Sequence, residues 1–561
     1  MLGPAKGRRV DQPVLASLDA LVPANHFYRL LESKLDLTFV RALVRGAYKD
    51  GGRPSIDPVV FFKLQLIMFF EGIRSERQLI EIASLHLAHR WYLGYAPDEA
   101  LPDHSSLTRI RTRYGLVAFR RFFETIVAQC RAAGLVWGKE LYFDATQVHA
   151  NASLDSIAPR FAVEAHLGEL FAEDGSDETD PENGDGQPIE LPVPITETER
   201  ERLADANAAR HDWLAREGAP DRTIMRAGYQ RRSDFEASVT DPDAALMAMK
   251  KGGLHFGYHD HYAVDGGKAR IILEALVTPA DVMENLPFLD MLRRAQFRWR
   301  LRPRQVTGDT TYGTVENIVA LEGQGIRAYV PLPDFDQRTP FYGASHFTYD
   351  PERDEYRCPQ DHVLRRRTAK YTEGTIAYRA EAATCNACPV KAACTEGSQG
   401  RLVHRSLYID YLDRVRGYHE TAAYKKAMAK RKAWVEPLFG EAKDWHGLRR
   451  FRLRRLWKVN VEALLIATGQ NLKRLLRQRG WGRRPWPNGA PEPVEIARSV
   501  PFLHLNIAKR RSPRGPLPER IRSQEGLSTP SPITRRNYPA VTGSGSATRA
   551  GSRTVKVDPC P

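Results

Sequence analysis

The segment from Arg431 to Arg455 reads RKAWVEPLFGEAKDWHGLRRFRLRR. It places one carboxylate, Glu436, among apolar and aromatic side chains, and Lys443 follows about two helical turns later. The segment then closes on five arginines: Arg449, Arg450, Arg452, Arg454 and Arg455. An acid followed by a cation and an arginine run fits a site that handles a phosphodiester backbone. The alternative is an amphipathic helix with a solvated basic end.

The bulk composition favours a polyanionic partner. The 561-residue chain carries 83 basic and 68 acidic residues, a net charge of +15, and neutralised phosphates release counterions on binding. Hydrophobic residues make up 42%, enough to build cores for several domains. The first apolar segment, 58–70, is interrupted by Lys63 and Gln65, so it predicts a buried helix and no membrane contact. We expect a cytoplasmic, nucleoid-associated protein.

Residues 1–135 show helical patterns. Ser75 starts a capping-box pattern for a helix through about Arg90, and Ser106 can cap a short basic helix. The short helix carries three arginines: Arg109, Arg111 and Arg113. A helix, a turn and a short basic helix are compatible with a helix-turn-helix reader of DNA, and equally with a plain helical bundle. A last helix, 117–133, presents aromatic residues at helical spacing, which indicates core.

The pattern changes to a strand at 141–148, LYFDATQV. One face of this strand carries Tyr142, Asp144, Thr146 and Val148. An acid in an otherwise apolar strand is costly to bury unless it is paired or bound to metal. The alternative is an edge strand with Asp144 facing water. Residues 155–240 lose the periodicity and include an acidic run, so we interpret them as an insertion with a mobile loop and a charged helix.

Strand patterns return at 256–265 and 269–278, where the turn at 265–267 predicts a hairpin. The following elements are a helix at 284–296, a strand at 304–313, a helix at 314–322 and a strand at 326–333. This order predicts a mixed α/β sheet. Asp309 ends one of its strands, and acids at strand ends lie where such sheets place ligands.

Four of the six cysteines cluster, namely Cys358, Cys385, Cys388 and Cys394. The C-x-x-C pair can bind one tetrahedral Zn²⁺, and the other two cysteines complete four ligands. Such a site is structural, because no coordination position stays open. The alternative is four unrelated buried thiols. After residue 480 the chain becomes rich in Pro, Gly, Ser and Arg without periodicity, which predicts a disordered basic tail at 481–561.

Three acids stand out, namely Asp144, Asp309 and Glu436. Three carboxylates from separate elements can hold two divalent metal ions for in-line phosphodiester chemistry, and oxygen ligands suit Mg²⁺ or Mn²⁺. The spacing alone does not prove this set, because the 68 acids of the chain offer many triples.

Several longer motifs occur in a fixed order over roughly residues 10–478. They are GRPSIDPVVFFKLQLIMFFEGIRSERQL, LPDHSSLTRIR, YFDATQVHANAS, SVTDPDA, GYHDHYAVD, GDTTYG and VEPLFGEAKDWHGLRRFRLRRLW. With these motifs the chain resembles the DDE transposases of bacterial insertion sequences, in the IS4/IS5-like superfamily and closest to the IS1182 group. The resemblance implies a ribonuclease-H-like core whose DDE triad matches Asp144, Asp309 and Glu436.

The resemblance also implies a domain order. We expect a helical, DNA-binding domain at 1–135, a core in two parts at 136–350 and 405–480, and a zinc-binding insertion at 351–404. The relatives' signature around the glutamate is Tyr, two residues, Arg, three residues, Glu, six residues, Lys. Glu436 and Lys443 fit it, whereas positions 429 and 432 are Ala and Lys, with Arg431 beside the latter. The role of positions 431 and 432 is therefore open.

The expected function is transposition, with cleavage at the element ends and joining of the 3′-OH to target DNA. Lys443 and the arginine run are expected to hold phosphates, and the partners are duplex terminal repeats, target DNA and further copies of the chain. The alternatives are an inactive relative that still occupies element ends, and a nuclease that never joins strands. Pro437 disfavours helix in the residue before it, so we expect a kink or a helix start at Glu436.

Overall fold

The computed structural model describes residues 15–49, 51, 55–159, 236–249, 253–334, 336, 340–371 and 374–479. Most of the expected insertion at 155–240 and all of the expected tail at 481–561 lie outside the described residues. The description that follows concerns the compact unit that contains residues up to 486.

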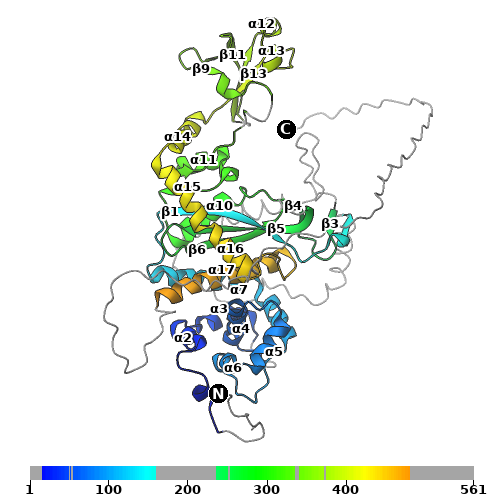
Figure 1. Cartoon of the computed structure of the whole chain (residues 1–561), viewed down its shortest axis with the longest axis vertical. Helices are drawn as coiled ribbons and strands as arrows, with labels where there is room; N and C mark the ends of the chain where they lie inside the picture. Colours follow the sequence, from blue (N-terminus) through cyan, green and yellow to red (C-terminus); the bar gives the residue numbers. More distant parts are fainter. Residues whose placement is uncertain are drawn as a thin grey trace, which may run out of the picture. The chain divides into compact units, whose positions relative to one another are not determined.

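The first part of the chain is helical, as predicted (Figure 1). Its helices are α1 Leu18–Leu21, α2 Phe27–Lys34, α3 Phe39–Val44, α4 Pro58–Glu71, α5 Glu76–Leu85, α6 Leu87–Leu93 and α7 His104–Ala132. Helix α4 starts with Asp57, whose carboxylate accepts from the Val59 N–H, and with Pro58 in the first turn. It ends at Gly72, whose φ of 66° suits a left-handed cap.

The helix boundaries differ from the predicted ones at two places. Ser75 caps α5 as predicted, but α5 ends at Leu85, and His86 caps the separate helix α6 by accepting from the His89 N–H. Asp103, and not Ser106, caps α7, because its carboxylate accepts from the Ser105 N–H. The predicted boundary between two helices near residue 116 is a break at Gly115, with φ 60° and ψ −179°. Asp and Ser are equivalent capping signals, so sequence alone does not choose between them.

A mixed sheet follows. Its strands are β1 Glu140–His149, β4 Ala245–Met249, β5 Gly253–Asp265, β6 Ile272–Pro279, β7 Gln305–Thr307 and β8 Arg327–Tyr329. The order is β4-β5-β1-β7-β8, with β6 also paired to β5; β5 is antiparallel to its neighbours, and β1, β7 and β8 are parallel. Strand β1 lies between β5 and β7, so the edge-strand alternative for Asp144 is wrong. The predicted strands at 304–313 and 326–333 are real but shorter.

The remaining helices pack on the sheet or extend beyond it. They are α10 Phe288–Trp299, α11 Val315–Glu322, α14 Ile409–His419, α15 Ala422–Trp434, α16 Glu436–Trp445 and α17 Leu456–Gln478. Short elements complete the described parts, namely β2 Ile157–Pro159 paired with β3 Glu236–Ser238, and the 3₁₀ turns Arg45–Ala47, Leu154–Ser156, Thr310–Tyr312 and Ala344–His346. None of the described helices combines the length and the apolar character needed to cross a membrane.

The cysteine-rich segment folds as an antiparallel sheet with a core of its own. Its elements are β9 Thr348–Asp350, β10 Glu355–Arg357, β11 Val363–Lys370, β12 Thr375–Ala380, β13 Leu402–Ser406, and the helices α12 Ala382–Asn386 and α13 Lys391–Cys394. Leu364, Tyr378 and Val403 are buried at the centre of this core. The sheet runs from Thr348 to Ser406, around the predicted insertion at 351–404.

Helix α17 joins the sheet to the N-terminal helices, and Figure 1 shows it lying between them. Two asparagines of α17, three helical turns apart, bind the edge strand β6. The side-chain amide of Asn460 bonds both the N–H and the C=O of Val277, and that of Asn471 bonds both groups of Ile272, at 2.8–3.0 Å. An open sheet edge exposes unpaired N–H and C=O groups, so these two amides complete the edge. On the other side, a side chain at Gly469 would collide with the Phe69 ring of α4.

Asn471→Ala is expected to lower the free energy of unfolding by about 2–6 kcal/mol, because it leaves two buried backbone groups of Ile272 unsatisfied, at about 1–3 kcal/mol each. Urea denaturation of the full chain measures this loss. Asn386→Ala is the matched control, because its amide bonds a carbonyl at an exposed site. An equal loss in both variants would contradict the edge-covering role.

Candidate active site

Asp144 occupies the middle of the central strand β1 and is 8% exposed. Its Oδ2 lies 3.0 Å from Nη1 of Arg431, which comes from α15, and its Oδ1 accepts from the Ala145 N–H at 3.0 Å. A buried carboxylate requires such compensation. Helix α15 therefore provides the cation that allows an acid in the middle of the sheet.

Asp309 is brought beside Asp144 by the parallel pairing of β1 with β7. Tyr142 pairs with Thr307; Asp144 lies two residues after Tyr142 on β1, and Asp309 lies two residues after Thr307, in the turn that follows β7. Neighbouring strands lie about 4.8 Å apart. Because both aspartates follow the same paired position by two residues, they lie beside each other where β7 ends. Asp309 is half-buried, and its carboxylate accepts from the Thr311 N–H at 2.9 Å, which fixes the turn after β7.

Glu436 approaches the two aspartates from the break between α15 and α16. Val435 separates the helices, and Pro437 lies in the first turn of α16, so the predicted helix start at Glu436 is confirmed. Burial raises the pKa of Asp144 to about 6; Arg431 opposes this, and the negative charges of Asp309 and Glu436 add to it. The three predicted acids therefore lie close enough for their charges to interact.

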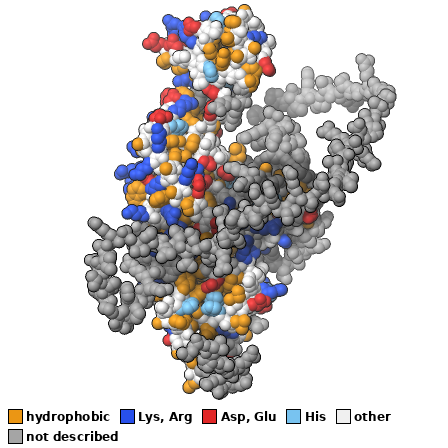
Figure 2. Space-filling model, viewed as in Figure 1, with side chains coloured by type: hydrophobic (Ala, Val, Ile, Leu, Met, Phe, Trp, Pro, Cys, Tyr) orange, Lys and Arg blue, Asp and Glu red, His pale blue; other side chains and the backbone are white. Residues whose placement is uncertain are grey.

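Arg431, and not Lys432, faces the acids. The Arg431 side chain is 12% exposed and pairs with Asp144, whereas Lys432 is exposed. One residue corresponds to about 100° of helix rotation, which turns the two side chains to different faces. Arg431 therefore keeps a guanidinium at the site although the motif spacing favoured position 432. Figure 2 shows Lys and Arg side chains gathered over α14 and α15.

Lys443 reaches the same face of the sheet. Its Nζ donates to Oγ1 of Thr146, two residues beyond Asp144 on β1. Burial lowers the pKa of Lys443, the charge of Arg449 lowers it further, and Asp260 opposes both. The predicted pair of Glu436 and Lys443 thus lies on one side of α16, beside the acids.

Two further residues at the site were not singled out from the sequence. Asp260, on β5, is fully buried and lies opposite Thr146 of β1. Burial raises the pKa of Asp260 well above the usual value, and the Tyr262 hydroxyl and Lys443 only partly offset this. Tyr312 is buried under the turn of Asp309, where a side chain at position 308 would strike its ring. The signal for Asp260 was present, because it interrupts an apolar strand in the same way as Asp144.

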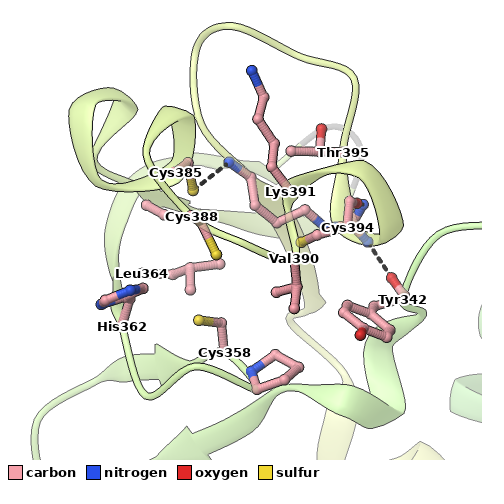
Figure 3. A pocket seen from close by; sticks show the side chains of 13 residues that line it. Tyr342, Cys358, His362, Leu364, Cys385, Cys388, Val390, Lys391, Cys394 and Thr395 are labelled. Carbon is pink, nitrogen blue, oxygen red and sulfur yellow. Dashed lines mark hydrogen bonds between the residues drawn. The ribbon is translucent and has the colours of Figure 1, made fainter.

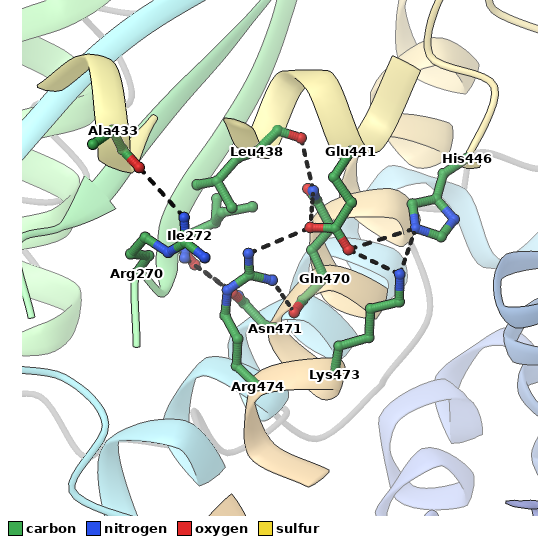
Figure 4. Close-up of polar contacts among 10 residues, drawn as sticks. All are labelled: Arg270, Ile272, Ala433, Leu438, Glu441, His446, Gln470, Asn471, Lys473 and Arg474. Atoms are coloured by element: carbon green, nitrogen blue, oxygen red, sulfur yellow. Dashed lines mark hydrogen bonds and ion pairs between the residues drawn. The ribbon is translucent and has the colours of Figure 1, made fainter. Parts of the chain in front are cut away.

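The opposite side of α16 is fixed to α17 through Glu441 (Figure 4). Its carboxylate lies 2.8 Å from Nζ of Lys473 and 3.4 Å from Nη2 of Arg474, and it accepts from Gln470 at 3.2 Å. Gln470 also donates to the Leu438 carbonyl at 2.8 Å. Burial alone would raise the pKa of Glu441, but its hydrogen-bonded and cationic neighbours hold it well below the usual range. These contacts set the position of the helix that begins with Glu436.

The arginine run after α16 is mostly engaged within the chain. Arg450 donates to the carbonyls of residues 150 and 152, Arg454 donates to the Asn151 carbonyl, and Arg452 lies 3.4 Å from Glu76. Arg455 lies 3.8 Å from Asp243. Arg449 is exposed, and among the described residues its ion pair is with Asp444, which is also exposed. Phosphate contact by the run therefore stays a prediction, with Arg449 the most accessible member.

The three predicted arginines of α7 differ in environment. Arg111 is 2% exposed and ion-paired with Glu76, so a phosphate contact does not fit its burial. Arg109 and Arg113 are exposed; Arg109 bonds Ser105, and Arg113 lies over the Tyr48 ring. Only these two stay candidates for DNA contact on this helix.

The four clustered cysteines line one cavity of the insertion, and Figure 3 shows their sulfurs around a shared space. Burial raises the pKa of the Cys394 thiol, and the three other cysteines add to this, which agrees with their closeness. The Arg401 N–H donates to Sγ of Cys385 at 3.4 Å. All four thiols are free. Within the described residues, no three His, Cys, Asp or Glu side chains are already placed to hold a metal ion.

Glu441→Gln is expected to lower the free energy of unfolding by about 2–4 kcal/mol at neutral pH, because Lys473 and Arg474 lose their half-buried counter-ion. The low pKa of Glu441 contributes stability above its unfolded value and loses it as pH falls, so the difference from the wild type should shrink below about pH 4. Urea unfolding between pH 3 and 8 measures both effects. Glu316→Gln, at an exposed acid of α11, is the control, and an equal effect there would contradict this role.

Comparison with protein families found two matches. A transposase domain (DUF772) matches residues 16–113, and a transposase DDE domain matches residues 357–476. The second match contains Glu436, Lys443 and the four clustered cysteines, whereas Asp144 and Asp309 lie between the matches. Comparisons with curated proteins and with solved structures found no match. The chain therefore carries two domains of transposases, consistent with a DDE transposase of the IS1182-like group.

Proposed function

We propose that the protein is a transposase that cuts DNA at the ends of its own insertion element and joins the 3′-OH to target DNA. One observation carries the proposal: the parallel pairing of β1 with β7 sets Asp144, in the middle of β1, beside Asp309, just after β7, and Glu436 lies close enough to add to the raised pKa of Asp144. The match of a DDE domain over Glu436 supports the same reading.

We further propose that the sheet is the ribonuclease-H-like core that the resemblance implies. In support, β6, β5, β1, β7 and β8 lie side by side, and β5 alone runs against the others. Of the parallel pair in the middle, β1 carries Asp144 and the turn after β7 carries Asp309, and the third acid comes from a later helix. The core thus brings together residues that are 165 and 127 positions apart in the sequence.

The donor chemistry of the three acids fits Mg²⁺ or Mn²⁺. Carboxylate oxygens suit these hard cations, and three carboxylates facing one guanidinium leave a negative charge that a divalent ion would neutralise. Asp144, Asp309 and Glu436 would hold two ions, which when bound activate the attacking oxygen and stabilise the leaving oxygen. Arg431 holds Asp144 in place and favours its ionised form.

Basic residues beside the acids would hold the DNA. Thr146 positions the Lys443 ammonium on the same strand face as Asp144, where it can bind a non-bridging phosphate oxygen. Arg449 and the remaining N–H donors of Arg450 and Arg454 would extend this surface, and Arg109 and Arg113 would contact DNA from the N-terminal domain. We propose that copies of the chain assemble on two element ends at the nucleoid.

The cysteine cavity is proposed to hold one structural Zn²⁺. Four free thiols line it, and a backbone N–H already donates to one sulfur, a contact that stabilises thiolates. The insertion has a small core, and domains of that size commonly rely on a metal or disulfides. The four sulfurs leave no position for catalysis.

Asp144→Asn, Asp309→Asn and Glu436→Gln are each expected to reduce cleavage and strand transfer by at least about 10²–10³-fold while end binding persists, because each removes a proposed metal ligand. Purified protein with Mg²⁺ and a duplex carrying an element end measures the reaction, and gel shift measures binding. Asp413→Asn, at an exposed acid of α14, is the control.

The products separate the alternatives for this prediction. Full strand transfer by any of the three variants would reject the triad. Binding by the wild type without cleavage in any divalent metal would indicate an inactive DNA-binding relative. Cleavage without joined products would indicate a hydrolytic nuclease.

One zinc ion per chain is expected by elemental analysis of the purified protein, and Cys385→Ser or Cys388→Ser should release it, because loss of one thiolate opens the tetrahedral site. Cys130→Ala, at a buried thiol of α7 far from the cluster in sequence, should keep the zinc. A wild-type protein without zinc would refute the site.

A further inference from the structure

The insertion sheet has one face packed on its core and one face toward solvent. Along β12, Ile376, Tyr378 and Ala380 are buried, while the residues between them are half-buried. We define the outer face as the solvent side of β11, β12 and β13. It is lined by Arg365, Ala377, Arg379, Leu402 and His404.

Two arginines stand directly opposite each other on this face. Arg365 of β11 pairs with Arg379 of β12 in the strand register. Side chains at opposite positions have Cβ atoms about 4.5–5.5 Å apart, and like charges there destabilise a sheet. Glu355 lies on the other side of Arg365, but its carboxylate is bonded by Arg357 at 3.4 Å. Neither Arg365 nor Arg379 has an ion pair among the described residues.

Other arginines of the insertion hold its structure together. Arg366 lies 2.9 Å from Asp354, Arg401 donates to two backbone carbonyls, and Arg405 lies 4.1 Å over the Tyr349 ring. The arginines that keep their guanidinium groups uncommitted near the outer face are thus a particular subset, namely Arg365, Arg379 and the exposed Arg367. A fold that opposes two arginines without neutralising them is suited to an external anion.

We propose that the outer face binds the phosphodiester backbone of duplex DNA, as a second contact surface apart from the acids of the active site. The guanidinium fork matches phosphate geometry, and binding would relieve the repulsion between Arg365 and Arg379. Phosphate contacts carry no sequence information, so we expect the contact to be independent of sequence. This inference rests on the proposed function, which supplies DNA as the partner.

The outer face and the cysteine cavity lie on opposite sides of the same sheet. Leu364 and Ala380 line the cavity, and they alternate along their strands with Arg365 and Arg379. A metal ion in the cavity would stiffen the sheet from behind. Substitution of the two arginines therefore leaves the cysteines untouched.

The test uses the full chain with Asp309→Asn, which blocks the proposed chemistry, and a fluorescein-labelled duplex of random sequence. Arg365→Ala/Arg379→Ala is expected to lower the slope of log K against log salt by about 1.8, because each lost phosphate contact contributes about 0.9. Between 50 and 200 mM salt, the variant should therefore lose roughly tenfold less affinity than its parent. Arg302→Ala/Arg353→Ala removes the same charge from exposed turns and should leave the slope unchanged.

A second variant separates charge from folding. Arg379→Glu places a carboxylate opposite Arg365, so the thermal midpoint should hold or rise while affinity for the duplex falls. An unchanged salt slope in Arg365→Ala/Arg379→Ala would refute DNA binding by the outer face and point to another partner, such as an acidic protein. A parent chain that binds no duplex at all would instead reject the proposed function.

Discussion

The burial of a carboxylate in the central strand β1 sets the condition that the surrounding structure has to meet. Asp144 can be ionised there only if a cation lies against it, and Arg431 meets this requirement from α15. The ion pair between Asp144 and Arg431 holds α15 against the sheet. The residues that follow Arg431 therefore lie near the acids. The helix then breaks at Val435, and α16 begins with the third carboxylate. The buried ion pair and the helix boundary thus place Glu436, and the β1–β7 pairing places Asp309.

Helix α17 is the element that holds this geometry in place. Two of its asparagines complete the edge strand β6, and Gln470, Lys473 and Arg474 hold α16 through Glu441 and Leu438. Gly469 allows the same helix to approach the Phe69 ring of α4. A single helix therefore contacts the sheet, the helix of Glu436 and the N-terminal domain, so a shift of one of these parts is resisted by the others.

The sequence predicted features that depend on local chemistry. Alternation in LYFDATQV indicated β1, Pro437 indicated a helix start, and the long helices followed their apolar spacing. It was less informative where two residues carry the same local signal: Asp103 and Ser106 both favour a cap. Nor does a run of β-forming residues show where pairing stops: β7 ends at Thr307, and Tyr312 packs against Gly308 directly after it. The triad needed the resemblance, because acids so far apart in sequence meet only through the strand register.

The arginine run also has a structural role that its charge did not predict. The chain leaving β1 at residues 150–152 has carbonyl groups without strand partners, and segment 449–451 lies beside it: the His149 N–H donates to the Arg449 carbonyl, and the Phe451 N–H to the His149 carbonyl. Arg450 and Arg454 then donate to the remaining carbonyls. A guanidinium has five N–H donors, so this structural use does not exhaust them. The run can therefore extend the central strand and still present charge to DNA. By contrast, Arg365 and Arg379, which lie opposite each other in the insertion sheet, carry charge without such a structural role.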